Sequence, residues 1–199
     1  MHPPETLTTE RLLLRRAHPD DAQALFDAYA SDPQATRYLS WRTHDTVAET
    51  TEFLENAATS WDGGGEFIWA LVPLGRTAAM GAIGAAPGPH GMEIGYVLGR
   101  DWWGQGLATE ALTRLMAWLR TQPGVYRIWA YCAVEHARSA RVLQRGGMTY
   151  EATLRRWVEL PNLADEPVDA LVFAWTRRAT QVGAQRAGAR PASSVRSGG

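Results

Sequence analysis

A glycine-rich turn, Gly104-Gln105-Gly106, lies between a strand-like segment and a helix-like segment. Large β-favouring residues alternate over residues 93–98, which predicts a strand. From Ala108 onward apolar residues recur three and four apart, which predicts a helix with one buried face. Because glycine lacks a Cβ, several backbone N–H groups before this helix can point at a ligand, with the positive end of the helix dipole behind them. This arrangement is suited to binding a phosphate group.

Two common nucleotide chemistries do not fit this turn. A P-loop requires a lysine, and all twenty residues of the Lys+Arg total are arginines. A dinucleotide-binding fingerprint requires a third glycine where Thr109 stands, so NAD is not expected. From these residues alone, a turn that simply closes a strand-to-helix connection stays open as an alternative.

The composition indicates one globular domain, since the chain has 199 residues of which 45% are hydrophobic. We expect a single domain over residues 1–177 and a disordered Arg/Ala/Gly/Ser tail over residues 178–199. No apolar run approaches the roughly 20 residues that span a bilayer, and the N-terminus lacks a signal pattern. We therefore expect a cytoplasmic protein with no membrane partner.

The charge of the chain is uneven. Net charge is −1, but residues 1–176 hold fifteen arginines against all twenty-one acids, a net −6. An acidic body favours a cationic amine substrate over nucleic acid. Nucleic-acid binding through the arginine-rich tail is the alternative, and we expect no such partner.

No metal site is expected. The single cysteine, Cys132, lies in an apolar segment and is interpreted as a packed thiol. The five histidines are scattered without the spacing of metal ligands.

The order of predicted elements indicates a mixed α/β class. A capping box, Thr46 with Glu49, marks the start of the second helix. The predicted helices cover residues 22–30, 46–61, 108 to the residue before Pro123, and 136–145. The predicted strands cover residues 12–14, 67–72, 78–84, 93–98, 126–132, 148–159 and 168–176.

This order, with a glycine turn after the fourth strand, resembles the GNAT acetyltransferases over residues 7–176. The residues from Trp103 to Ala111 are most similar to the RimJ/RimL-type subgroup. The general family pattern has Gln or Arg where Trp103 stands, Gly at Gly106, and Gly or Ala at Ala108. The resemblance implies the GNAT fold, a mixed and mostly antiparallel sheet of about seven strands flanked by about four helices.

The resemblance also implies acetyl-CoA as co-substrate, with its pyrophosphate on the glycine turn. The stretch 134–148 resembles a second family motif, Asn-x-x-Ser followed by an apolar helix and Gly-Phe, with His136 and Met148 replacing Asn and Phe and with Ser139 retained. The implied acetyl-CoA contacts are Val97, Leu98, Trp103, Gly104, Gln105, Gly106, Leu107, Ala108, Thr109, His136 and Ser139.

Amide formation from a thioester requires a neutral amine, a stabilised oxyanion and a proton for the departing thiolate. Glu93 is the first candidate base and Glu159 the rival, both by resemblance. A solvated strand glutamate is the alternative for Glu93. Ser139 is the implied acid, against the alternative of a first-turn serine. Backbone N–H groups near Val97 or Leu98 are expected to stabilise the oxyanion.

For the acceptor, Tyr38, Trp41 and Trp157 occupy segments that flank the substrate cleft in the family. An aromatic wall can contact a cationic amine, although most of the nine tryptophans are expected in the core.

The sequence therefore predicts an N-acetyltransferase that moves an acetyl group from acetyl-CoA to a primary amine by direct attack in a ternary complex. The acceptor is a protein N-terminal α-amine, such as that of a ribosomal protein, or a small-molecule amine. The alternative is a non-catalytic acyl-CoA-binding sensor, which the departures at Trp103 and His136 keep open. RimL-like enzymes are often homodimers, so we predict a homodimer.

Overall fold

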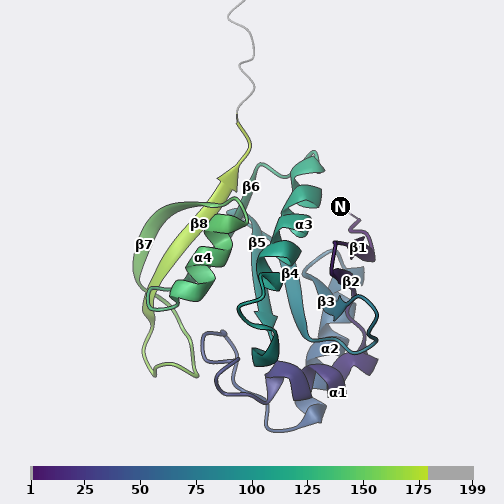
Figure 1. The fold of residues 1–199 in the computed structure, drawn as a ribbon. Helices are drawn as coiled ribbons and strands as arrows, with labels where there is room; N and C mark the ends of the chain where they lie inside the picture. The colour runs from purple at the N-terminus through teal and green to yellow at the C-terminus, as the bar shows by residue number, and fades with distance from the viewer. Residues whose placement is uncertain (1, 179–199) are drawn as a thin grey trace, which may run out of the picture.

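The structure is a computed structural model, and it describes residues 2–178 (Figure 1). The predicted tail from residue 179 onward lies outside the described residues. Within residues 2–178, eight strands form one sheet in the order β1-β2-β3-β4-β5-β6-β8-β7, antiparallel except for β5 and β6. The strands are β1 Thr6–Thr8, β2 Leu12–Arg16, β3 Phe67–Pro73, β4 Gly81–Gly88, β5 Gly91–Leu98, β6 Arg127–Ala133, β7 Thr149–Val158 and β8 Val168–Thr176.

This architecture confirms the predicted fold class and corrects its strand count and one boundary. The missed strand, β1, has three residues of which only Leu7 is buried, too few to show an alternating pattern. The predicted strand over 78–84 begins later, at Gly81, and continues through Pro87 to Gly88, where it pairs with Gly91. Alanine, glycine and proline have low β-propensity, so the pairing with β5 and not local preference sets this boundary. The glycine turn consequently follows the fifth strand.

The helices cover both faces of the sheet (Figure 1). α1 Ala22–Leu25 and α2 Val47–Asp62 pack on one face, and α3 Leu107–Thr121 and α4 Ala137–Arg145 pack on the other. The predicted helix over 22–30 is divided into α1 and a π-helical turn, Phe26–Ala30, and a 3-10 turn, Pro19–Asp21, precedes it. The predicted capping box of α2 is present, with the Glu49 carboxylate accepting the Thr46 backbone N–H at 2.8 Å.

The central feature of the sheet is the divergence of β5 from β6. The two strands pair only at Met92 with Ile128 and at Glu93 with Trp129 among the described residues. Beyond Glu93 the strands separate, so the C-terminal half of β5 has backbone N–H and C=O groups on that edge with no partner from β6. A cleft opens in the middle of the sheet.

The end of α4 packs closely against α3 at Gly146, because glycine has no side chain. A Cβ on Gly146 would lie 2.4 Å from Cδ2 of the fully buried Leu112. The φ of Gly146 is −71°, so the substitution Gly146→Ala would cause overpacking and no backbone strain. We expect Gly146→Ala to lower the free energy of unfolding by about 1–3 kcal/mol, measured by denaturant titration.

The matched control is Gly124→Ala, because a Cβ there would meet nothing within 4 Å and its φ is not in the left-handed region. Equal stability of the two variants would contradict the packing argument.

Candidate active site

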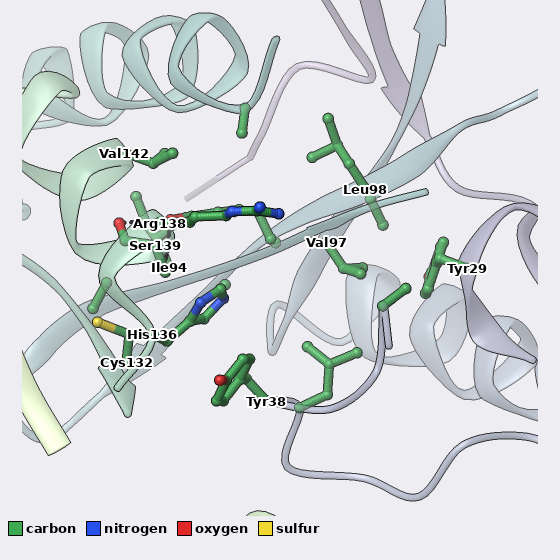
Figure 2. A pocket seen from close by; sticks show the side chains of 18 of the residues that line it. Tyr29, Tyr38, Ile94, Val97, Leu98, Cys132, His136, Arg138, Ser139 and Val142 are labelled. Atoms are coloured by element: carbon green, nitrogen blue, oxygen red, sulfur yellow. Dashed lines mark hydrogen bonds between the residues drawn. The ribbon is translucent and has the colours of Figure 1, made fainter. Parts of the chain in front are cut away.

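A cavity of about 800 Å³ occupies the cleft between the separated strands (Figure 2). Its walls come from β4, β5, β6, the start of α3, α4 and the segment 35–41. Segments far apart in the sequence therefore meet around one space.

The glycine turn forms one end of this cavity. Gly104 and Gly106 have φ values of 76° and 81°, a left-handed conformation that favours glycine. The N–H groups in the first turn of α3 have no intrahelical acceptor, and Leu107, Ala108 and Thr109 line the cavity. This end of the cavity is therefore suited to an anion.

Gln105 is placed differently from its neighbours. Its side-chain amide donates to the Asp101 carbonyl at 2.9 Å, and its own carbonyl accepts from Arg11 Nη1 at 3.0 Å. Gln105 does not line the cavity. It holds the turn in place from outside.

Trp103 connects the turn to the end of β5. Its indole N–H donates to the Leu98 carbonyl at 2.8 Å, and the Arg138 guanidinium carbon lies 5.5 Å from its ring centroid. Trp103, Val97 and Leu98 all line the cavity. The aromatic side chain thus fixes the turn by packing and one hydrogen bond.

Three arginines that the sequence analysis missed face the same cavity. Arg138, Arg141 and Arg145 occupy one side of α4 and line the cavity. Figure 2 shows Arg138 extending from α4 into the cavity. Their spacing of three and four residues along one side of the helix was the available signal. Together with the start of α3 they make this part of the cavity electropositive.

Ser139 lies within a small polar cluster. The Tyr96 hydroxyl is 2.8 Å from Ser139 Oγ, and it donates to the Ser139 carbonyl oxygen at 3.2 Å. Burial raises the pKa of Tyr96, so its phenol stays protonated. The Cys132 thiol also contacts Ser139, and burial raises its pKa to about 11. The sequence analysis missed Tyr96, although alternation along β5 places it on the opposite face from Glu93.

His136 stacks on Tyr38, with ring centroids 4.1 Å apart and an interplanar angle of 14° (Figure 2). Burial first, and then the charge of Arg138, lower the pKa of His136 to about 4. The imidazole is therefore neutral at physiological pH. The stack joins the start of α4 to the segment that carries Tyr38.

Two glutamates lie on the other side of the cavity. Burial first, and then the negative charge of Glu66, raise the pKa of Glu93, and burial raises the pKa of Glu66. Both side chains line the cavity. Glu66 was missed because it belongs to no motif and only the pairing of β3 with β4 brings it near Glu93.

The remaining predicted residues are divided between the cavity and the surface. Tyr38 and Trp41 line the cavity, and Trp41 also stacks against Phe53 with ring centroids 6.2 Å apart. Glu159 is exposed and does not line the cavity. Trp157 packs edge-on against Tyr131 at 5.2 Å, outside the cavity lining.

Within residues 2–178 there is no group of three or more His, Cys, Asp or Glu side chains arranged to hold a metal ion. In the same part of the chain no helix combines the length and the apolar character needed to cross a membrane.

Comparison with known proteins agrees with this geometry. The family model described as an acetyltransferase (GNAT) domain matches residues 11–149. An uncharacterized N-acetyltransferase, p20 of Bacillus licheniformis, is 30% identical over 87% of this chain and 97% of its own length. A ribosomal protein uS5 alanine N-acetyltransferase of Escherichia coli is 27% identical over 75% of this chain and 80% of its own length.

Solved structures share the fold. Mycobacterium smegmatis RimJ in complex with CoA-disulfide has a TM-score of 0.78 at 23% identity, covering 88% of this chain and 90% of that one. RimL, a ribosomal α-N-protein acetyltransferase in complex with coenzyme A, has a TM-score of 0.76 at 20% identity, covering 86% of this chain and 98% of that one. The family model matches more than half of the chain, so the chain belongs to the GNAT acetyltransferase family as an acetyl-CoA-dependent N-acetyltransferase, and its relatives and its fold are RimJ/RimL-like.

Proposed function

We propose that this enzyme acetylates a primary amine by direct attack on the thioester within a ternary complex. The observation that carries the proposal is the alternation along β5 at the point where it leaves β6. Glu93 lies on the face toward α1 and α2, whereas Tyr96 lies on the face toward α4. The candidate base and the candidate acid therefore lie on opposite sides of one strand, which supports separate positions for deprotonating the amine and protonating the leaving thiolate.

The residues present fit acetyl-CoA. Gly104, Gly106 and the first turn of α3 would hold the pyrophosphate, and Arg138 and Arg141 would neutralise phosphate charge from the facing helix. The unpaired edge of β5 would hydrogen-bond the amide groups of the pantetheine arm. Acetyl-CoA supplies an activated acetyl group when bound.

The chain's own groups would then move the protons. Glu93 accepts a proton from the acceptor ammonium, directly or through water, and leaves a nucleophilic amine. The hydroxyls of Tyr96 and Ser139 provide the proton that the leaving thiolate needs. Backbone N–H groups near Val97 or Leu98 stabilise the oxyanion. His136, being neutral and stacked on Tyr38, orients the start of α4 and takes no part in proton transfer.

The acceptor is a protein N-terminal amine or a small-molecule amine. The Escherichia coli relative is named for a ribosomal protein alanine, which supports a protein N-terminus as one of these two acceptor classes. Tyr38 and Trp41 line the cavity and would contact the acceptor, whereas Trp157 and Glu159 do not line it, and their predicted roles stay predictions. The predicted homodimer stays a prediction.

The test is titration calorimetry with acetyl-CoA beside desulfo-CoA and NAD, followed by thiol release against a panel of amines and N-terminal peptides. Binding of acetyl-CoA with amine-dependent release would support the proposal. Binding without release on any acceptor would instead favour the non-catalytic sensor. An absence of acetyl-CoA binding would overturn both.

The arginine side of α4 gives a sharper test of how acetyl-CoA binds. We expect Arg138→Gln and Arg141→Gln each to raise the Kd for acetyl-CoA by about tenfold or more, because each removes a charge-assisted contact to phosphate. The weakening should diminish as salt increases, since screening already reduces the contact. The matched control is Arg155→Gln, an exposed arginine on β7 outside the cavity. Equal Kd values for all three variants would remove the arginines from the site.

A further inference from the structure

Two carboxylates, those of Glu66 and Glu93, lie in one row across the sheet. They line the part of the cavity where the acceptor amine would bind, which we call the acceptor side. Phe67 pairs with Ala85 and Ala86 pairs with Glu93, so Glu66, just before β3, stands opposite Ala86 and in line with Glu93. Two strand spacings separate the Cα atoms of Glu66 and Glu93, about 10 Å. Residues in one row share a face, so both side chains lie on the α1/α2 side.

Beside the row that holds these carboxylates, the floor of the cavity carries few side chains. The next row on the same face contains the paired glycines Gly84 and Gly95, with Ile68 of β3 opposite Gly84. A Cβ on Gly95 would meet no atom within 4 Å, so this position opens into free space. A Cβ on Gly84 would lie 3.3 Å from Glu66 Oε1, which shows that the Glu66 carboxylate leans over Gly84 toward this space.

Neither carboxylate is neutralised by the protein. Among residues 2–178 neither Glu66 nor Glu93 takes part in a salt bridge, and neither carboxylate accepts a hydrogen bond. Burial raises the pKa of both groups, and the charge of Glu66 raises that of Glu93 further. A cation beside the half-buried Glu93 would offset the cost of burying its charge, and a cation beside the exposed Glu66 would add a weaker, solvent-screened attraction. Aromatic rings suited to cations complete the lining: Tyr38, Trp41, Phe53 and Tyr131.

We propose that the preferred acceptor is a compact diamine, in which one amine is acetylated beside Glu93 while Glu66 holds the second as an ammonium ion. This inference rests on the proposed acetyltransferase function. A monoamine would leave one of the two carboxylates that line the cavity, the half-buried Glu93 or the exposed Glu66, without a counter-charge, and a protein N-terminus offers one ammonium followed by a neutral peptide group. In the reaction the thioester C–S bond breaks and a C–N bond forms. One proton of the reacting ammonium goes to Glu93 and from there to solvent. The thiolate leaves with a proton from the Tyr96 and Ser139 pair, and the second proton lost by the nitrogen returns to that pair through solvent.

The experiment compares 1,4-diaminobutane with n-butylamine, which has the same carbon chain and one charge fewer. We expect the kcat/KM for the diamine to exceed that for the monoamine by at least about tenfold in the wild-type enzyme. In Glu66→Gln the ratio should fall to near one, and in Glu66→Asp most of the preference should return. Glu52→Gln, an exposed residue on α2 outside the cavity, is the matched control and should keep the wild-type ratio.

A wild-type ratio near one, or a ratio unchanged by Glu66→Gln in a variant with wild-type melting temperature, would overturn the inference. Equilibrium binding of the same two amines to the CoA-bound protein keeps this test separate from turnover. If no amine and no peptide is acetylated but 1,4-diaminobutane binds more tightly in a Glu66-dependent way, the charge argument holds and the proposed catalysis fails. If peptides are acetylated and the diamine neither reacts nor binds, the proposed function stands and the diamine inference is wrong.

Discussion

Replacing Glu93 with glutamine is expected to lower kcat for amine acetylation by about 10²–10⁴-fold, the usual contribution of a general base. Acetyl-CoA should bind nearly as well as to the wild type, since the α3 turn and the α4 arginines are unchanged. The measurement is steady-state thiol release, with the Kd for acetyl-CoA determined by calorimetry on the same sample. The fall in kcat without a matching rise in Kd would place Glu93 in the chemical step.

The pH dependence of kcat/KM provides a second test of Glu93 as the base. Glu93 acts as a base only when ionised, so kcat/KM of the wild-type enzyme should rise with pH as Glu93 loses its proton. Burial and the charge of Glu66 raise the pKa of Glu93, so this rise should lie above the ordinary glutamate value of 4.5. In Glu93→Gln the rise should be absent.

The contribution of Glu93 to folding stability should fall as pH rises, opposite to the rise expected for kcat/KM. A carboxyl group whose pKa is raised by folding favours the folded state most at low pH, and this contribution is lost as pH rises through the raised value. At neutral pH the ionised Glu93 therefore carries a cost that glutamine lacks. Glu93→Gln should melt no lower than the wild-type protein at pH 7.

The control is Glu159→Gln, which changes an exposed glutamate outside the cavity. We expect it to keep wild-type kcat. The opposite pattern, a loss in Glu159→Gln and none in Glu93→Gln, would make Glu159 the base and would require β7 to approach the cleft during turnover.

Removing the hydroxyl of Tyr96 or of Ser139 is expected to lower kcat by about 10²-fold each, because the leaving thiolate loses its proton donor. The two hydroxyls lie 2.8 Å apart and act as one unit. The double variant Tyr96→Phe with Ser139→Ala should therefore lose little more than either single variant. Single-turnover thiol release measures the step directly.

Tyr150→Phe is the matched control, since the Tyr150 hydroxyl contacts Thr153 on the exposed part of β7. Additive losses would show that the two hydroxyls act separately. Full activity in the double variant Tyr96→Phe with Ser139→Ala would show that Ser139 is a first-turn serine with a structural role only.

Local patterns were sufficient for most of the fold. The apolar period of α3 predicted a buried face, and Ala111, Leu112, Leu115 and Leu119 are all buried. The predicted strand over 168–176 agrees with β8 at both ends. These elements were predictable because propensity and periodicity act within one segment. The same method missed β1, which is short, and misplaced the bounds of β4, which consists of small residues. Pairing with neighbouring strands determines whether β1 forms and where β4 begins and ends.

Less of the candidate site than of the fold could be predicted from the sequence. The residue types at Gly104, Gly106 and Ser139 predicted the phosphate-binding turn and the acid through resemblance, because these positions have local conformational or chemical requirements. In the sequence, Glu93 and Glu159 are both glutamates in segments predicted to be strands, so the sequence alone could not show which of them lies in the cavity. The tertiary structure placed Glu93 in the cavity and Glu159 on the surface.

The sequence by itself thus determined the family, the anion-binding turn and the helix that supports it. Only the tertiary structure decided which side chains meet: Tyr96 with Ser139, the α4 arginines with the start of α3, and Glu66 with Glu93. The reason is that the divergence of β5 from β6 and the register of β3, β4 and β5 are non-local. Each brings together residues from separate segments, and no single segment carries a signal of its eventual neighbour.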